Sequence, residues 1–218
     1  MPKPIVLWGG AGHAKVLREF LDAAGYHLVA VFDHDTSVPA PFPDVPLYHG
    51  PEGFARWHQA FGMHPVAGVA AIGGAHGQDR LRIHEFFERH GVEVPVLVHP
   101  TAFVAASARL GKGTQVLAHA AVCAEAHLGD ACIVNTRGSV DHECVLGHGV
   151  HVAPGATLAG CVSVGDFSLV AVGAVVLPRI SIGRNVVIGA GSVVTRDVPD
   201  GAVAFGAPAR IRRGAPVT

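Results

Sequence analysis

The chain has little net charge, few cysteines and no long apolar segment. Its 218 residues carry a formal net charge of −1, which argues against nucleic acid or a charged membrane surface as a partner. No stretch of 18 apolar residues is free of glycine, proline and charge, so we predict no membrane span. The four cysteines form no C-x-x-C pair, and no secretory signal precedes Ile5. We therefore expect a cytoplasmic protein without a disulfide framework.

One feature is highly regular: an aliphatic residue occupies every sixth position from Val98 to Val194. A small residue usually stands two positions earlier, and glycine often follows the aliphatic residue. A period of six fits neither an α-helix nor an ordinary strand, and it is typical of a hexapeptide-repeat parallel β-helix. Three hexads make one triangular coil, so residues 18 apart should stack. Cys132 and Cys144 occupy small-residue positions, and we expect them to be buried thiols.

The first part of the chain has a different pattern, in which short apolar strands alternate with helices. The strands are expected at 4–8, 28–32 and 66–72, and the helices at 14–24, 51–61 and 77–90. This alternation predicts a parallel α/β sheet with right-handed crossovers, that is, a Rossmann-like domain. We predict two domains, a Rossmann-like domain at 1–97 and a β-helix domain at 98–218 that ends in a basic tail with Arg210, Arg212 and Arg213.

A glycine-rich loop, Gly9–Gly12, lies between the first strand and the first helix. Such a loop brings backbone N–H groups close to a phosphate, although a tight turn without a ligand is the alternative. Lys15 replaces the third glycine of G-x-G-x-x-G, which argues against a redox dinucleotide. Acidic residues after the second strand could accept hydrogen bonds from a ribose or a base, or only cap the strand. The candidate residues for a nucleotide-linked ligand at this sheet edge are Gly10, Gly12, Asp33, Asp35 and Gly73.

The segment Asn135–Cys144 carries polar and charged residues that the repeat pattern does not require. Because Val140 and Cys144 keep the inward register, Asp141, His142 and Glu143 should project outward. An imidazole between two carboxylates is a good general base, and either carboxylate could fix its tautomer. A plain surface histidine is the alternative.

Stacking adds two further candidates. Gly160 follows His142 by 18 residues, so its N–H could stabilise an oxyanion one coil away. His151 follows His142 by 9 residues, which is half a coil, so the two cannot easily share a face of one prism. They could meet only where two prisms pack side by side around a threefold axis. We therefore expect a site between subunits, with an exposed surface residue as the alternative for His151. No cysteine is placed to form a covalent intermediate with the enzyme, so a group transferred at this site would pass directly from one substrate to the other.

From Ile5 to Arg212 the sequence resembles the PglD/NeuD family of bacterial sugar acetyltransferases. The most specific matching segments are Gly9–His13, Asn135–Glu143, His151–Pro154 and the closing stretch at 198–209. The resemblance implies a left-handed β-helix and a homotrimer with acetyl-CoA between neighbouring prisms. It also implies that the N-terminal domain holds a nucleotide-linked sugar.

The resemblance assigns roles to individual residues. It implies that His142 is the base, Glu143 its partner carboxylate and Gly160 the amide on the acetyl carbonyl. It places His151 and Ala190 near acetyl-CoA, Asn135 at the acceptor, and His13 and Asp33 against the sugar nucleotide. The implied reaction moves the acetyl group of acetyl-CoA to the amino group of a UDP- or GDP-linked 4-amino-deoxy sugar, without a metal.

Three other functions remain open from the sequence. O-acetylation of sialic acid or another sugar hydroxyl would need the same base. A zinc hydratase of the γ-carbonic-anhydrase type would need three convergent histidines, and His142, His148 and His151 lack that family's spacing. The third is a binding or structural β-helix without catalysis.

Overall fold

The computed structural model describes residues 1–62 and 64–212, so Arg213 of the predicted basic tail lies outside the described residues. The chain divides into two compact units. The first comprises Met1–Ile72 and Arg82–Pro95, and the second comprises Gly73–Leu81 and the chain from Val96 onward. Among the described helices, none is long and apolar enough to cross a membrane.

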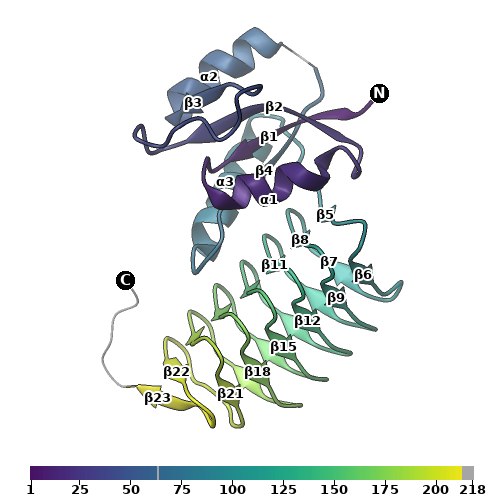
Figure 1. Cartoon of the computed structure of the whole chain (residues 1–218), viewed down its shortest axis with the longest axis vertical. Coiled ribbons are helices and arrows are strands. Elements are labelled where there is room, and N and C mark those ends of the chain that lie inside the picture. Colours follow the sequence, from purple (N-terminus) through teal and green to yellow (C-terminus); the bar gives the residue numbers. More distant parts are fainter. Residues whose placement is uncertain (63, 213–218) are drawn as a thin grey trace. The chain divides into compact units, whose positions relative to one another are not determined.

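The first unit is built on a four-stranded parallel sheet of order β3-β2-β1-β4 (Figure 1). Its strands are β1 (Lys3–Trp8), β2 (Tyr26–Asp33), β3 (Leu47–His49) and β4 (Ala67–Ala70), and the helices of the chain are α1 (Gly12–Leu21), α2 (Gly50–Phe61) and α3 (Gly77–Arg89). The predicted parallel α/β arrangement is confirmed. Strand β3 was not predicted, because three residues after Pro46 are too few to show an alternating pattern.

Aromatic side chains fill the core on one face of this sheet. Trp8 at the end of β1 stacks on Phe32 of β2 at a centroid distance of 5.6 Å. Phe54 of α2 and Phe87 of α3 pack against the same cluster, and all four side chains are buried. Because these rings lie under the ends of β1 and β2, they fix the position of the loops that follow those strands.

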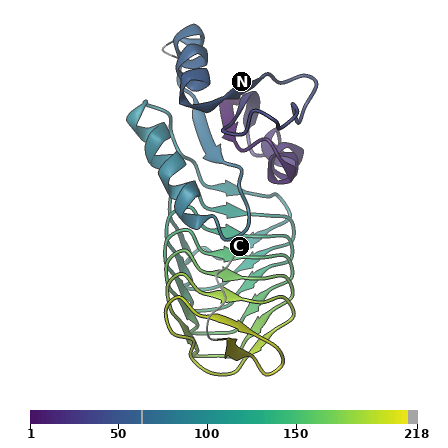
Figure 2. The same ribbon diagram turned by 90° about the vertical axis from the view of Figure 1, so that its left-hand side faces the viewer.

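The second unit is a prism of three parallel sheets, whose coils are stacked in Figure 2. The first face holds β5 (Leu97–Val98), β8 (Gln115–Val116), β11 (Ile133–Val134), β14 (His151–Val152), β17 (Leu169–Val170), β20 (Val187–Ile188) and the closing hairpin β22 (Val203–Phe205) and β23 (Arg210–Arg212). The second face holds β6 (Phe103–Val104), β9 (Ala121–Val122), β12 (Ser139–Val140), β15 (Thr157–Leu158), β18 (Val175–Val176) and β21 (Val193–Val194). The third face holds β7 (Arg109–Leu110), β10 (His127–Leu128), β13 (Val145–Leu146), β16 (Ser163–Val164) and β19 (Ser181–Ile182). The predicted left-handed β-helix is confirmed.

The stacking of residues 18 apart is confirmed along the prism. Ser139 pairs with Thr157 and Val140 with Leu158 in parallel strands. The second residue of each strand points into the prism, and the small residue two positions earlier is buried at the corner. Cys132 and Cys144 are buried as predicted, and each thiol donates a hydrogen bond to a carbonyl oxygen of the next coil.

The start of α3 is attached to the first face of the prism. Arg80 is fully buried and donates from Nε to the carbonyl of Ala131 at 3.0 Å and from Nη2 to the carbonyl of Gly149 at 2.7 Å. Burial lowers the pKa of Arg80 to about 10, so the guanidinium remains charged at neutral pH. Gly77 touches Gly149 so closely that a Cβ on Gly77 would lie 2.2 Å from the Gly149 carbonyl oxygen. Segment 73–81 therefore covers part of this face, next to β11 and β14.

Candidate active site

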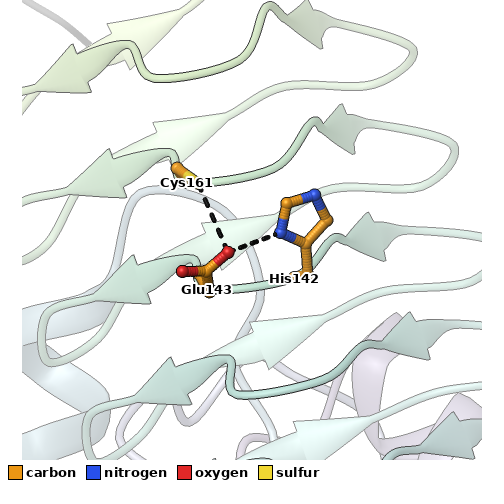
Figure 3. A group of neighbouring side chains, drawn as sticks. All are labelled: His142, Glu143 and Cys161. Atoms are coloured by element: carbon orange, nitrogen blue, oxygen red, sulfur yellow. Dashed lines mark hydrogen bonds and ion pairs between the residues drawn. The ribbon is translucent and has the colours of Figure 1, made fainter.

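The His142–Glu143 pair lies at the corner between β12 and β13, where the second face meets the third. His142 Nδ1 and Glu143 Oε2 are 2.9 Å apart, and a dashed line marks this contact in Figure 3. The Asp141 carboxylate instead accepts a hydrogen bond from the His142 backbone N–H at 2.7 Å. In this structure the ring therefore contacts Glu143, while Asp141 holds the backbone. The hydrogen bond from His142 is the main reason why the pKa of Glu143 lies below its ordinary value.

The corner geometry explains why both side chains project outward. Glu143 has a left-handed backbone (φ 58°), and its N–H donates to the Ala124 carbonyl of the preceding coil at 2.9 Å. Cys144 then turns into the prism. About half of each side-chain surface of His142 and Glu143 is exposed, so a ligand can reach both.

Gly160 lies directly beside the imidazole ring. A Cβ built on Gly160 would be 2.3 Å from Nε2 of His142, so the ring fits only against a glycine. The Gly160 carbonyl accepts a hydrogen bond from the Arg179 N–H. Among the described residues, no hydrogen bond involves the Gly160 N–H or His142 Nε2, which leaves one donor and one proton acceptor near each other.

A cysteine that was not predicted at this site also belongs to the group. Cys161 Sγ lies 3.7 Å from Oε2 of Glu143. The sequence contained the signal, because Cys161 follows Glu143 by 18 residues and therefore stacks on it. Cys161 was missed because only the cysteines two positions before an aliphatic residue, Cys132 and Cys144, were interpreted from the repeat.

A second group of predicted residues lies at a different corner, between the first and second faces. Asn135 Nδ2 is 3.1 Å from His151 Nε2, and His151 Nδ1 is 3.1 Å from the Gly74 carbonyl oxygen. These partners assign the proton to Nδ1, since the carbonyl can only accept. His151 is 5% exposed, so the alternative of an exposed surface residue is wrong. A Cβ on Gly73 would lie 3.7 Å from the same ring.

Asn135 follows β11 and His142 follows β12, so the two belong to successive corners of one coil. Ala190 is exposed at the corner of Asn135, three coils further along. A single chain therefore presents the predicted catalytic residues on one edge of the second face, and the predicted acceptor and acetyl-CoA residues on the other edge.

In the first unit, Asp33 ties the glycine loop to the end of β2. Its Oδ2 accepts the Gly10 N–H at 2.6 Å, and its Oδ1 accepts the Asp35 N–H at 3.0 Å. Gly9 requires glycine, because its φ is 121° and a Cβ would lie 2.5 Å from the Ala71 carbonyl oxygen. Asp35 accepts from the Ser37 hydroxyl and N–H, and these hydrogen bonds lower its pKa.

The next two residues begin helix α1. Gly12 opens the helix with no atom within 4 Å of its Cβ position, and His13 follows it. The N-terminus of α1 thus starts directly after the loop, as expected for a site that binds an anion.

The three histidines of a γ-carbonic-anhydrase-type site do not come together. His148 Nδ1 accepts the Asp130 N–H, and His151 contacts Asn135. Within the described part of the chain, the three residues that could converge on a metal ion are His142, Glu143 and Cys161.

Comparison with known proteins agrees with the hexapeptide-repeat fold. The family model "Bacterial transferase hexapeptide (six repeats)" matches residues 161–196. A search among curated protein sequences gives no match.

Among solved structures, PerB from Caulobacter crescentus in complex with CoA and GDP-perosamine is 37% identical, with a TM-score of 0.86 over 96% of this chain and 97% of that chain. A variant of this perosamine N-acetyltransferase, with a histidine replaced by asparagine, is 36% identical, with a TM-score of 0.87 over 97% of each chain. The acetyltransferase domain of PglB from Neisseria gonorrhoeae, in complex with acetyl coenzyme A, is 30% identical, with a TM-score of 0.85 over 97% of this chain and all of that chain. The chain therefore belongs to the hexapeptide-repeat sugar N-acetyltransferases of the PglD/NeuD type.

Proposed function

We propose that this protein transfers the acetyl group of acetyl-CoA to the amino group of a UDP- or GDP-linked 4-amino-deoxy sugar, with His142 as general base. The observation that carries the proposal is the 2.9 Å contact between His142 Nδ1 and Glu143 Oε2, with the ring seated against Gly160. The nature of the relatives supports the reaction class, since PerB was solved with CoA and GDP-perosamine. A histidine was also the residue replaced in the PerB variant.

The mechanism follows from these positions. The sugar amine attacks the thioester carbonyl, and His142 Nε2 takes the proton that the amine loses. Glu143 stabilises the resulting imidazolium through Nδ1. The Gly160 N–H donates to the tetrahedral oxyanion, which then collapses and breaks the C–S bond. The His142 imidazolium returns its proton to the departing sulfur, so CoA leaves as a thiol and the base is regenerated. Holding the two substrates together contributes most of the rate enhancement, and the base adds roughly 10²–10⁴-fold.

The nucleotide-linked sugar is assigned to the loop side of the first unit. Gly10, Gly12 and His13 surround the start of α1, where backbone N–H groups and the helix dipole favour a phosphate. Asp33 already accepts the Gly10 N–H, so a bound phosphate has to share or displace that hydrogen bond. Asp35, which also accepts hydrogen bonds, is assigned to the ribose or base. Gly73, which was predicted at the same sheet edge as these residues, belongs to the second unit and lies beside His151.

A homotrimer would complete the site. The outward residues of the second face include no charged side chain; they are Phe103, Ala121, Ser139, Thr157, Val175 and Val193. This face lies between the corner of His142 and the corner of Asn135 and Ala190. If three second faces pack around a threefold axis, each His142 corner meets the opposite corner of a neighbour. Acetyl-CoA would then lie between subunits, with His151 and Ala190 on one side.

The acceptor is tested by following thiol release from acetyl-CoA with a panel of nucleotide-linked 4-amino sugars and free sialic acid. We expect release with an amino sugar, together with an N-acetylated product. Release with sialic acid alone would contradict N-acetylation and favour the O-acetyltransferase reaction. Because acetyl-CoA and nucleotide sugars are cytoplasmic metabolites, the proposal places the reaction in the bacterial cytoplasm.

A further inference from the structure

A thiol stands beside the pair that we assign to proton transfer (Figure 3). Cys161 Sγ is 3.7 Å from Glu143 Oε2, and the same oxygen is 2.9 Å from His142 Nδ1. One potential ligand atom from each of the three side chains lies within 4.8 Å of the other two. The arrangement is fixed by the fold, because Glu143 and Cys161 stack at one corner with left-handed φ values of 58° and 61°.

The three donor atoms are of the types that zinc binds in proteins: imidazole nitrogen, carboxylate oxygen and thiolate sulfur. Around a tetrahedral ion with bonds of about 2.0–2.3 Å, the ligand atoms lie roughly 3–4 Å apart. The observed separations are close to this range, so side-chain rotation alone can close the site. His142 and Glu143 are half exposed, so an ion can enter from solvent and keep an open fourth position.

We propose that His142, Glu143 and Cys161 bind one zinc ion per chain and that this ion reversibly inhibits the enzyme. Binding releases the Cys161 thiol proton to solvent. An ion on Nε2 occupies the base directly. An ion on Nδ1 leaves Nε2 protonated, so that it cannot accept a proton from the amine, and it also removes Glu143 from the ring. The inhibitory part rests on the proposed function, whereas the binding site itself does not.

The other cysteines provide a contrast. Cys132 and Cys144 are buried and donate to backbone carbonyls, which makes them inaccessible to an ion. Cys123 is partly buried at the same type of corner, one coil before Asp141, and it is not among the converging ligands. It therefore serves as the matched control.

The site is tested by titrating the full chain with Co²⁺, because a thiolate bound to cobalt gives a charge-transfer absorption that oxygen and nitrogen ligands do not. We expect one equivalent to produce this absorption in the wild type and in Cys123→Ser, and Zn²⁺ to abolish it by displacement. Cys161→Ser should lack the absorption and bind Zn²⁺ at least ten-fold more weakly by calorimetry. Absence of the band in the wild type, its persistence in Cys161→Ser or its loss in Cys123→Ser would each overturn the site.

Inhibition is tested in the thiol-release assay, with each variant compared with its own zinc-free rate. We expect Zn²⁺ to inhibit the wild type, a chelator to restore the rate, and Cys161→Ser to need at least ten-fold more Zn²⁺. Binding without inhibition would overturn the inhibitory role. A protein that releases no thiol in zinc-free buffer with any acceptor would contradict the proposed function, while the cobalt spectrum would still decide the metal site.

Discussion

Gly160 and His142 depend on each other, because the imidazole edge occupies the space that a side chain at position 160 would need. We predict that Gly160→Ala displaces the ring and lowers kcat by about 100-fold or more, since a 1 Å misplacement can cost that much. Steady-state kinetics and far-ultraviolet circular dichroism measure the two effects separately. Gly201→Ala is the control, because nothing lies within 4 Å of its Cβ position; its φ of 66° makes this substitution strained too, but the strain does not touch the imidazole. Equal rates in the two variants would contradict this reading.

Glu143 is predicted to stabilise, through its negative charge, the imidazolium that forms on His142 during the reaction. Its pKa is lowered mainly by the hydrogen bond from His142, so the carboxylate is ionised at neutral pH and loses its charge only as the pH falls through that lowered value. We predict that Glu143→Gln lowers kcat by roughly 10–100-fold, because the imidazolium loses its partner carboxylate. An unchanged kcat in Glu143→Gln would argue for Asp141 as the partner.

The residues of the candidate site at the corner between β12 and β13 were largely predictable from their type and spacing. His142, Glu143 and Gly160 follow from an acid-His-acid segment and the 18-residue stacking. The Asn135–His151–Gly74 contacts were not predictable, because they depend on how segment 73–81 folds onto the first face.

The position of each cysteine in the six-residue repeat determines how reactive its thiol is. Burial raises the pKa of Cys132 to about 12 and that of Cys144 to about 11, while both thiols also donate hydrogen bonds. Since the thiolate is the reactive form, we predict that an alkylating reagent at neutral pH labels the partly exposed Cys161 and Cys123 and spares Cys132 and Cys144. Labelling of Cys123 should be slowed, because burial raises its pKa as well. Mass spectrometry of the labelled peptides checks this. Labelling of Cys132 before unfolding would contradict the inward position of its slot.

The first turn of α3, which belongs to the second unit, is held to the prism by Arg80, which satisfies two backbone carbonyls. Arg80→Ala leaves both carbonyls without this donor and opens a cavity, so we predict a loss of about 2–4 kcal/mol in the free energy of unfolding. Urea denaturation measures it. Arg89→Ala, an exposed position on the same helix, should change stability by no more than about 0.5 kcal/mol. A similar small effect for Arg80→Ala would mean that the contact is dispensable.

Elements with a long periodic signal were predicted well, and short ones were not. The β-helix strands follow from one phase kept from Val98 to Val194, whereas β3 is set by its pairing with β2 rather than by its own sequence. Arg80 was missed because an arginine on a predicted helix is usually exposed, and only the packed prism reveals its burial.

At the scale of the whole molecule, the uncharged second face is predicted to form the trimer. Thr157→Lys would place like charges near the threefold axis, so we expect light scattering to give the mass of one 22.5 kDa chain instead of about three. Acetyl transfer should be lost with the trimer. Val145→Lys, on the exposed outer row of the third face, should remain trimeric. A trimeric Thr157→Lys protein would place the interface elsewhere.

The central proposal is that His142 is the base of acetyl transfer. The direct measurement is the turnover of the wild type and of His142→Ala with acetyl-CoA and a GDP- or UDP-linked 4-amino sugar across pH. We predict that the variant keeps its fold, loses at least about 100-fold in kcat and loses the inflection that a general base gives the pH–rate profile. A folded His142→Ala protein with a near-normal rate and an unchanged profile would contradict the account.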